Sequence, residues 1–220
     1  MANTNTDMDS LRAAAQQAVR DLRTRISGLG PDEIEMILSG ARSHYAWTDR
    51  PVTHEQLKVI YDITRMGPTS MNCCPARFIF VTTKDGKARL VKALARANVD
   101  KVLSAPVTVI IAHDLEFWNR LPELFPYDDR RAAFSGNAEH AKTTAFRNAT
   151  LQGAYFIIAA RAVGLDVGAM SGFSNAAVDA EFFAGTTLRS NFLCNLGYAD
   201  ESAIFQRLPR LDFESACSFE

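Results

Sequence analysis

The pattern that most constrains this fold is one long helical segment set among a few short buried strands. Residues 138–163 carry apolar side chains at the three- and four-residue steps of a helix. The buried positions predicted on it are Ala145, Leu151, Tyr155, Ile158 and Ala162. Strands are predicted at three short apolar runs, residues 78–81, 106–112 and 188–196, and no regular βαβ repeat joins them. We therefore expect an α+β fold with a small mixed or antiparallel sheet.

Shorter helices are predicted around these strands. An apolar stripe predicts a helix over 10–27, and a second helix follows Pro31. Thr53 and Gln56 have the spacing of a capping box at the start of a third helix. The other elements expected are a helix over 84–97, a Gly-rich loop over 165–173 and a short helix that Asn175 caps.

Composition and charge exclude several classes of protein. Lys and Arg total 24 and Asp and Glu total 25, so the net charge of −1 argues against a basic nucleic-acid-binding surface. No apolar run approaches the roughly 20 residues that span a bilayer. The polar segment 1–9 lacks the basic and apolar regions of a secretory signal. We expect no nucleic-acid partner and no membrane association.

Cysteines, histidines and glycines narrow the chemistry further. The cysteines lack CxxC spacing and are too few for a disulfide framework, so we expect reduced thiols in a cytoplasmic protein. The histidines are scattered along the chain, and no metal site is expected. A dinucleotide-binding GxGxxG after a strand and a Walker phosphate loop are both missing. A Ser or Cys nucleophile with a remote base stays open at this point.

Residues 42–44 place a cation, a hydroxyl and an imidazole in a row. Arg42 supplies a two-pronged donor and Ser43 a short hydrogen bond, with His44 beside them, so the three side chains suit a phosphate. In the tail, Arg207 and Arg210 can also close on an anion. The alternatives are a solvated helix end and a pair of surface charges.

Two further loops carry small or uncharged groups. The segment 68–72 (PTSMN) combines a proline with two hydroxyls and an amide, which suit a flat heteroaromatic ring that has imide groups. Small residues over 168–172 (GAMSG) let backbone N–H groups approach a ligand closely. The alternatives are a capped turn and an ordinary connection between helices.

In their order and spacing over residues 34–216, these segments resemble the FMN-dependent nitroreductase family. That family has an Arg-Ser-x-basic stretch, a Pro-Ser-Ser-x-Asn turn before its first strand, a Gly-containing loop after its long helix and an Arg near its C-terminus. The resemblance implies a small central antiparallel sheet flanked by helices, with a C-terminal segment exchanged in a homodimer. It assigns residues 33–220 to this FMN-binding domain and leaves 1–32 as a helical extension.

The resemblance also implies FMN as cofactor, NADH or NADPH as co-substrate, and ping-pong hydride transfer through flavin N5. The cofactor-binding residues that it implies are Arg42, Ser43 and His44; Pro68, Thr69, Ser70 and Asn72; Met170, Ser171 and Gly172; and Arg207 and Arg210. No side chain is assigned a catalytic role, because the hard chemistry belongs to the flavin. The chain departs from the family pattern at Tyr45, Thr69, Cys74, Ala76 and Leu208.

A closer resemblance is to the malonic semialdehyde reductase branch that is associated with uracil breakdown. The stretches that carry it are GPTSMNCCPARFIF, LFPYDDRR, TAFRNATLQGAYFI, GAMSGF and RLPRLDFESAC. It implies reduction of malonic semialdehyde to 3-hydroxypropionate, and candidates to bind the substrate carboxylate are Arg120, Arg130 and Arg131 in the pocket roof over 117–131. A broad nitroaromatic or quinone reductase is the alternative enzyme. A flavin-binding or helical interaction protein without turnover is the alternative from another class.

Overall fold

The computed structural model describes residues 3–220, and the chain divides into two compact units that meet at Gly40 and Ala41. The N-terminal unit holds α1 (Asn3–Arg25), α2 (Pro31–Ile34) and the π-helical turn η1 (Glu35–Ser39). Pro31 occupies the first turn of α2, where its missing N–H leaves no hydrogen bond unmade. The apolar stripe of α1 is exposed, including Leu11 and Leu22.

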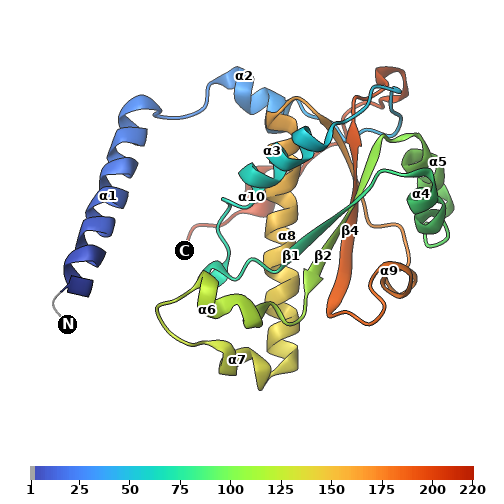
Figure 1. The fold of residues 1–220 in the computed structure, drawn as a ribbon. Helices are drawn as coiled ribbons and strands as arrows, with labels where there is room; N and C mark the ends of the chain where they lie inside the picture. Colours follow the sequence, from blue (N-terminus) through green and yellow to red (C-terminus); the bar gives the residue numbers. More distant parts are fainter. Residues whose placement is uncertain (1–2) are drawn as a thin grey trace. The chain divides into compact units, whose positions relative to one another are not determined.

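The second unit is built on a four-stranded antiparallel sheet with the strand order β1-β2-β4-β3 (Figure 1). The strands are β1 (Ala76–Val81), β2 (Val107–Asp114), β3 (Asp166–Met170) and β4 (Leu188–Gly197). The central strands β2 and β4 are the most buried, whereas β1 and β3 form the two edges. The predicted α+β class with a small antiparallel sheet is confirmed.

Helices cover both faces of this sheet (Figure 1). The long helix α8 (Ala138–Ala162) and α3 (His54–Thr64) pack on one face, and α4 (Lys84–Val91), α5 (Arg96–Ser104) and α9 (Asn175–Phe182) pack on the other. The remaining elements are η2 (Ser70–Asn72), η3 (Phe117–Arg120), α6 (Leu121–Leu124), α7 (Arg131–Ser135), η4 (Glu201–Ala203) and α10 (Phe213–Ala216).

The alternation of side chains along β2 divides the core in two. Val109 and Ile111 face α3 and α8, where they pack with Phe156. Ile110 and Ala112 face α4, α5 and α9. Both sets are fully buried, because helices cover both faces of the sheet. A third cluster around Phe117, Leu121 and Phe134 seats η3, α6 and α7 against the first turns of α8.

The sequence predicted correctly several elements whose stabilising contacts lie within a few residues. The three predicted strands correspond to β1, β2 and β4, and the helix predicted over 138–163 is α8. The capping box is present: Thr53 Oγ1 accepts from Gln56 N, and Gln56 Oε1 accepts from Thr53 N. Gly164 follows α8 with a φ of +81°, a conformation that ends a helix readily.

Three expectations were wrong. The helix expected over 84–97 is broken into α4 and α5, because Ala95 N donates to Gly172 O and Leu94 bridges Phe173. The loop expected over 165–173 contains the edge strand β3, which pairs with β4. Leu151 of α8 was expected to be buried but is 43% exposed, and Ala162 is exposed too. The short helix expected at Asn175 forms, with Ser174 as its cap.

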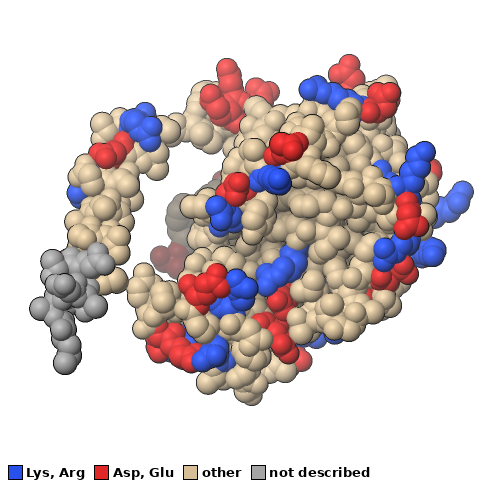
Figure 2. All heavy atoms as spheres, viewed as in Figure 1, with Lys and Arg blue, Asp and Glu red and all other residues tan. Residues whose placement is uncertain are grey.

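Charged side chains are mixed on the surface. Figure 2 shows basic and acidic groups interspersed over the face that it draws, in keeping with a net charge of −1. Over the part of the chain that the structure describes, no helix combines the length and apolarity needed to cross a membrane.

Candidate functional site

The segment that begins at Arg42 lies along the free edge of β3. Ser43 forms a parallel bridge with Val167, and His44 N donates to Val167 O at 3.0 Å. A side chain at Gly168 would bring its Cβ to 2.4 Å from His44 O, so this close approach requires glycine. The edge of the sheet therefore places Arg42, Ser43 and His44 beside one another.

Basic side chains gather where this segment meets the end of α8 and the C-terminal tail. Arg42 Nη2 donates to Phe205 O, and Arg207 Nη2 donates to Ala41 O at 3.2 Å. Arg161 Nη2 donates to Arg42 O at 3.3 Å. We call Arg42, His44, Arg161 and Arg207 the basic cluster. Sequence analysis missed Arg161, because a single Arg in the last turn of a long helix carries no distinctive signal.

Burial shapes the electrostatics of this cluster. His44 Nε2 lies 3.2 Å from Asp166 Oδ1, and the hydrogen bond between them lowers the pKa of Asp166. Burial lowers the pKa of the Arg161 guanidinium, because the charged form loses solvation. His44 Nδ1 is buried and has no hydrogen-bond partner among the residues that the structure describes, which makes it a candidate ligand contact.

Strand β3 runs from this cluster directly into Met170, Ser171 and Gly172. Gly172 O accepts hydrogen bonds from Ala95 N at 2.9 Å and Asn98 Nδ2 at 3.0 Å. A Cβ at Gly172 would lie 2.6 Å from Asn98 Nδ2, so a larger residue would displace the Asn98 amide from its bond to Gly172 O. The loop at the end of β3 is thus held against the start of α5.

Asn98 also orients a cation that sequence analysis did not find. Lys101 Nζ donates to Asn98 Oδ1 at 3.0 Å and lies 4.8 Å from the centre of the Tyr45 ring. Tyr45 stands where the family often has a second basic residue, so Lys101 brings a positive charge to that place from another element. An Asn and a Lys three residues apart share one helix face, but that pattern is too common to signal a site.

The turn Pro68–Asn72 lies elsewhere along α8. Pro68 O accepts from Tyr155 Oη at 3.0 Å, and Ser70 N donates to Asn148 Oδ1 at 2.8 Å. Asn148 and Arg161 are 13 residues apart in α8, which is roughly 20 Å along the helix axis. Within one chain, β3 therefore links the 42–44 segment to Met170–Gly172, and the turn is bound to α8 through Asn148 and Tyr155.

The tail arginines are placed differently from each other. Arg207 belongs to the basic cluster, as described above. Arg210 Nη1 donates to the carbonyls of Leu208 and Pro209, at 2.9 and 3.1 Å, so its side chain is bound to its own segment. Of the two arginines that the sequence left open, the structure brings Arg207 to the Arg42 segment.

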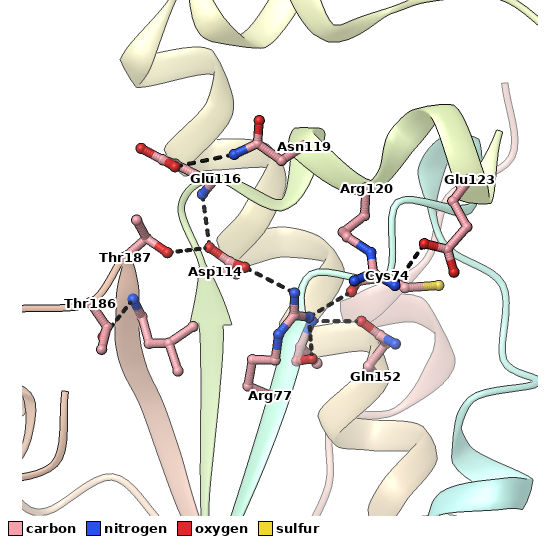
Figure 3. Close-up of polar contacts among 12 residues, drawn as sticks. Cys74, Arg77, Asp114, Glu116, Asn119, Arg120, Glu123, Gln152, Thr186 and Thr187 are labelled. Atoms are coloured by element: carbon pink, nitrogen blue, oxygen red, sulfur yellow. Dashed lines mark hydrogen bonds and ion pairs between the residues drawn. The ribbon is translucent and has the colours of Figure 1, made fainter. Parts of the chain in front are cut away.

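A cavity of about 590 Å³ lies beside the turn, between α3, β1 and α6. Three arginines line it, and each has a carboxylate partner (two of the pairs are shown in Figure 3). The pairs are Arg65–Asp62 at 3.1 Å, Arg77–Asp114 at 2.9 Å and Arg120–Glu123 at 2.6 Å. Tyr61, Phe78 and Phe80 give the cavity an aromatic wall.

The other arginines proposed for substrate binding are also paired. Arg130 contacts Asp128 at 2.8 Å, and Arg131 contacts Asp129 at 2.7 Å. Hydrogen bonds from Arg131 lower the pKa of Asp129 to about 2. Arg120 alone of the three lines the cavity.

The two buried cysteines are unsuited to nucleophilic attack. Burial raises the pKa of Cys73 and Cys194 to about 12, so neither is a thiolate nucleophile near neutral pH. Among the described residues, no group of three or more His, Cys, Asp and Glu side chains is placed to hold a metal ion.

Comparison with known proteins identifies the class to which this fold belongs. The model of the nitroreductase family matches residues 38–198, and the chain belongs to that family. A Ralstonia pickettii protein named NADH dehydrogenase/NAD(P)H nitroreductase HadB is 58% identical over 181 residues, which cover 81% of this chain and 92% of that protein.

Solved structures share the fold at low sequence identity. The nitroreductase ydfN of Bacillus subtilis superposes with a TM-score of 0.78 at 18% identity, over 87% of this chain and 100% of its own. An Exiguobacterium sibiricum nitroreductase in complex with FMN gives a TM-score of 0.76 at 21% identity, over 88% of this chain and 99% of its own.

Replacing Asp166 by Asn should destabilise the fold in a pH-dependent way. The hydrogen bond from His44 lowers the pKa of Asp166 from its ordinary value of 3.8. Such a carboxylate stabilises the fold above its unfolded-state pKa, and this contribution is lost as the pH falls through the folded-state pKa. At pH 7 we expect Asp166→Asn to lower the free energy of unfolding by about 1 kcal/mol, since the carboxylate is 42% exposed and screened by solvent.

Urea denaturation near pH 7 and near pH 3 measures this effect. The difference between wild type and Asp166→Asn should shrink at the lower pH, which lies below the ordinary pKa of 3.8, because the unfolded chain then takes up a proton at Asp166. Asp62→Asn, which removes an exposed pair with Arg65, is the control and should have a smaller effect. An equal loss at both pH values would show that the ionised carboxylate is not the cause.

Proposed function

We propose that this chain is an FMN-dependent NAD(P)H oxidoreductase. The observation that carries the proposal is the basic cluster at the start of β3, which leads along the sheet edge into Met170–Gly172. Membership of the nitroreductase family and the name of the 58% identical relative support the same function. The FMN complex of the Exiguobacterium sibiricum protein supports the choice of flavin.

The residues present fit a flavin mononucleotide. Arg42 and Arg207 offer charge-assisted donors for the phosphate dianion, and His44 Nδ1 would add a third donor in a protonated ring, since Nε2–H faces Asp166. Lys101 adds a positive charge beside Tyr45, where the family pattern is broken. At the end of β3, the backbone N–H groups of Ser171 and Gly172 are the donors that we assign to the edge of the ring that holds N5.

A bound FMN would supply the hydride chemistry that connects NAD(P)H to a second substrate in a ping-pong cycle. The protein's part in this cycle is to bind and orient. The basic cluster fixes the phosphate end, and Asn98 holds the Gly172 loop so that its donors stay in place. We assign no side chain to proton transfer.

We propose a neutral quinone or nitroaromatic as the electron acceptor. Recognition of a carboxylate requires a cation that no other acid neutralises, but Arg120, Arg130 and Arg131 each have a carboxylate partner within 3 Å. Arg65 and Arg77 of the cavity are paired as well. Malonic semialdehyde remains the second candidate, since the stretches LFPYDDRR and RLPRLDFESAC support it.

Spectroscopy and kinetics test this function together. We expect a yellow protein whose released cofactor has the mass of FMN, and NAD(P)H should bleach it. At equal concentrations, a benzoquinone or a nitroaromatic should reoxidise the reduced protein faster than malonic semialdehyde. Faster reoxidation by the semialdehyde would reverse the choice of acceptor, and bound flavin without turnover would favour a binding protein. A protein that stays colourless with added FMN would contradict the function itself.

We further propose a homodimer in which the C-terminal tail is exchanged. Edge strand β1 pairs only with β2, and the cavity beside it has an apolar wall. The tail carries exposed apolar side chains, Leu208, Leu211 and Phe213, that are suited to cover such a surface. A dimer also allows the turn of one chain to meet the basic cluster of its partner.

Two lesser proposals concern the ends and the location of the chain. The family match starts at residue 38 and the second compact unit starts at Ala41, which supports our assignment of 1–32 as an extension outside the FMN-binding domain. The four cysteines are present as free thiols, which supports a cytoplasmic location.

Negative charges introduced into the C-terminal tail should weaken this dimer. We expect Leu211→Asp combined with Phe213→Asp to raise the dimer dissociation constant at least about tenfold, because loss of apolar contacts worth about 1.4 kcal/mol has that effect. Light scattering over a concentration series measures the constant. Leu103→Asp is the control, since Leu103 is exposed on α5, away from the tail. A dimer unchanged by the tail variant would contradict the exchange.

Arg207→Ala should weaken FMN binding by roughly 10- to 150-fold, since a charge-assisted contact contributes about 1.5–3 kcal/mol of binding free energy. Riboflavin lacks the phosphate and should bind wild type and variant equally, as measured by fluorescence quenching. Arg210→Ala should have the smaller effect, because that side chain bonds to its own segment. If Arg207→Ala lost as much affinity for riboflavin as for FMN, Arg207 would have a structural role and not a phosphate-binding one.

A further inference from the structure

The turn Pro68–Asn72 and the residues after it adopt an unfavourable backbone conformation. Met71 and Asn72 each have a φ of +51°, and Cys74 has a φ of +39°. Residues with a Cβ rarely adopt these values, because the side chain crowds the following carbonyl. The conformation therefore depends on contacts from outside the turn.

Part of this support comes from α8 and from within the turn. Asn148 accepts from Ser70 N, and Gln152 Oε1 accepts from Ala76 N at 2.9 Å. Thr69 Oγ1 accepts from Cys74 N at 3.2 Å. These bonds satisfy N–H groups of the turn, but they leave the Cys74 carbonyl to another donor.

Arg77 supplies that donor. Its Nη1 donates to Cys74 O at 3.1 Å and to Ala76 O at 2.9 Å, while Nη2 donates to Asp114 Oδ2 at 2.9 Å (Figure 3). A planar guanidinium can make these bonds together because its N–H groups are fixed in one fork. A flexible ammonium cannot reproduce this arrangement.

Asp114 in turn is held from three sides. Its Oδ1 accepts from Thr187 Oγ1 at 2.6 Å and from Glu116 N at 3.0 Å (Figure 3). Its own N donates to Pro75 O at 3.0 Å. Its side chain is only 16% exposed. Asp114 thus connects the turn to the end of β2, the start of β4 and the segment that leads into η3.

We propose that Arg77 and Asp114 are a positioning pair that holds the turn in its flavin-binding conformation. Arg77 orients the Cys74 carbonyl and keeps the left-handed residues in place, and Asp114 orients Arg77. Through the turn, the pair affects binding of the flavin ring, because the turn offers uncharged donors and acceptors that suit the ring. The phosphate is assigned to the basic cluster instead. This inference rests on the proposed function.

The variants that test it are Arg77→Lys, Arg77→Gln and Asp114→Asn. Flavin affinity is measured by fluorescence quenching with both FMN and riboflavin, and thermal unfolding is followed in parallel. We expect Arg77→Lys to weaken both flavins by the same factor, about tenfold, which corresponds to about 1.4 kcal/mol. The double variant Arg77→Gln with Asp114→Asn should be no worse than Arg77→Gln alone, since the two residues act as one unit.

Arg89→Lys is the matched control. Arg89 Nε contacts Glu181 Oε1 at 2.6 Å and Nη2 donates to Glu181 O, so this fork joins α4 to α9, far from the turn in the sequence. We expect Arg89→Lys to shift the melting temperature and to leave the affinity for both flavins unchanged. This separates a general effect of losing an Arg fork from an effect on the turn.

Each outcome has a distinct meaning. If wild type binds flavin and the three variants bind it within about twofold of wild type, the positioning role is overturned and the proposed function stands. A lower melting temperature with unchanged flavin affinity also overturns it, because Arg77 then serves only the fold. A larger loss of affinity for FMN than for riboflavin would place Arg77 at the phosphate and overturn the assignment.

If wild type binds neither flavin, the proposed function itself fails. Should Arg77→Gln fail to fold, Arg77→Lys and Asp114→Asn decide the question.

Discussion

The close approach of the His44 backbone to Gly168 is the contact on which the candidate site depends. A β-carbon at position 168 would lie 2.4 Å from His44 O, so the segment that begins at Arg42 can pair with β3 only because glycine is there. That pairing sets Arg42 and His44 at the start of β3 and within reach of Arg161 and the tail. The same strand then delivers Met170–Gly172 to the start of α5. One edge strand therefore supplies both ends of a site that is long enough for a mononucleotide.

Helix α8 relates this edge of the sheet to the rest of the molecule. Its small residues Ala159 and Ala160 are buried in the sheet-facing cluster and let the helix lie close to the sheet. Its polar residues are distributed along its length: Asn148 binds the turn after α3, and Arg161 binds the Arg42 segment. Asn148 and Arg161 lie roughly 20 Å apart along the helix axis, so one long helix contacts both groups of flavin-binding candidates.

Ion pairing limits what the cavity beside β1 can recognise. Its three arginines line the wall, yet each is neutralised by a nearby carboxylate. Arg77 is the most constrained of them, since its guanidinium also bonds to two backbone carbonyls. An aromatic wall with internally paired charges suits an uncharged planar acceptor better than a small carboxylate.

The sequence by itself determined the elements whose stabilising contacts lie within a few residues. The period of α8, the Thr53–Gln56 capping box and the apolar strands β1, β2 and β4 follow from local spacing, and residue chemistry marked Arg42–His44 and Pro68–Asn72. Only the tertiary structure decided the rest. Strand β3 is too short and too rich in small residues to signal a strand, and it exists because β4 offers it hydrogen bonds. The break between α4 and α5 exists because Gly172 and Phe173 capture Ala95 and Leu94. Asn98, Lys101 and Arg161 join the site from distant positions in the sequence, and local spacing carries no information about contacts that only the packed fold creates.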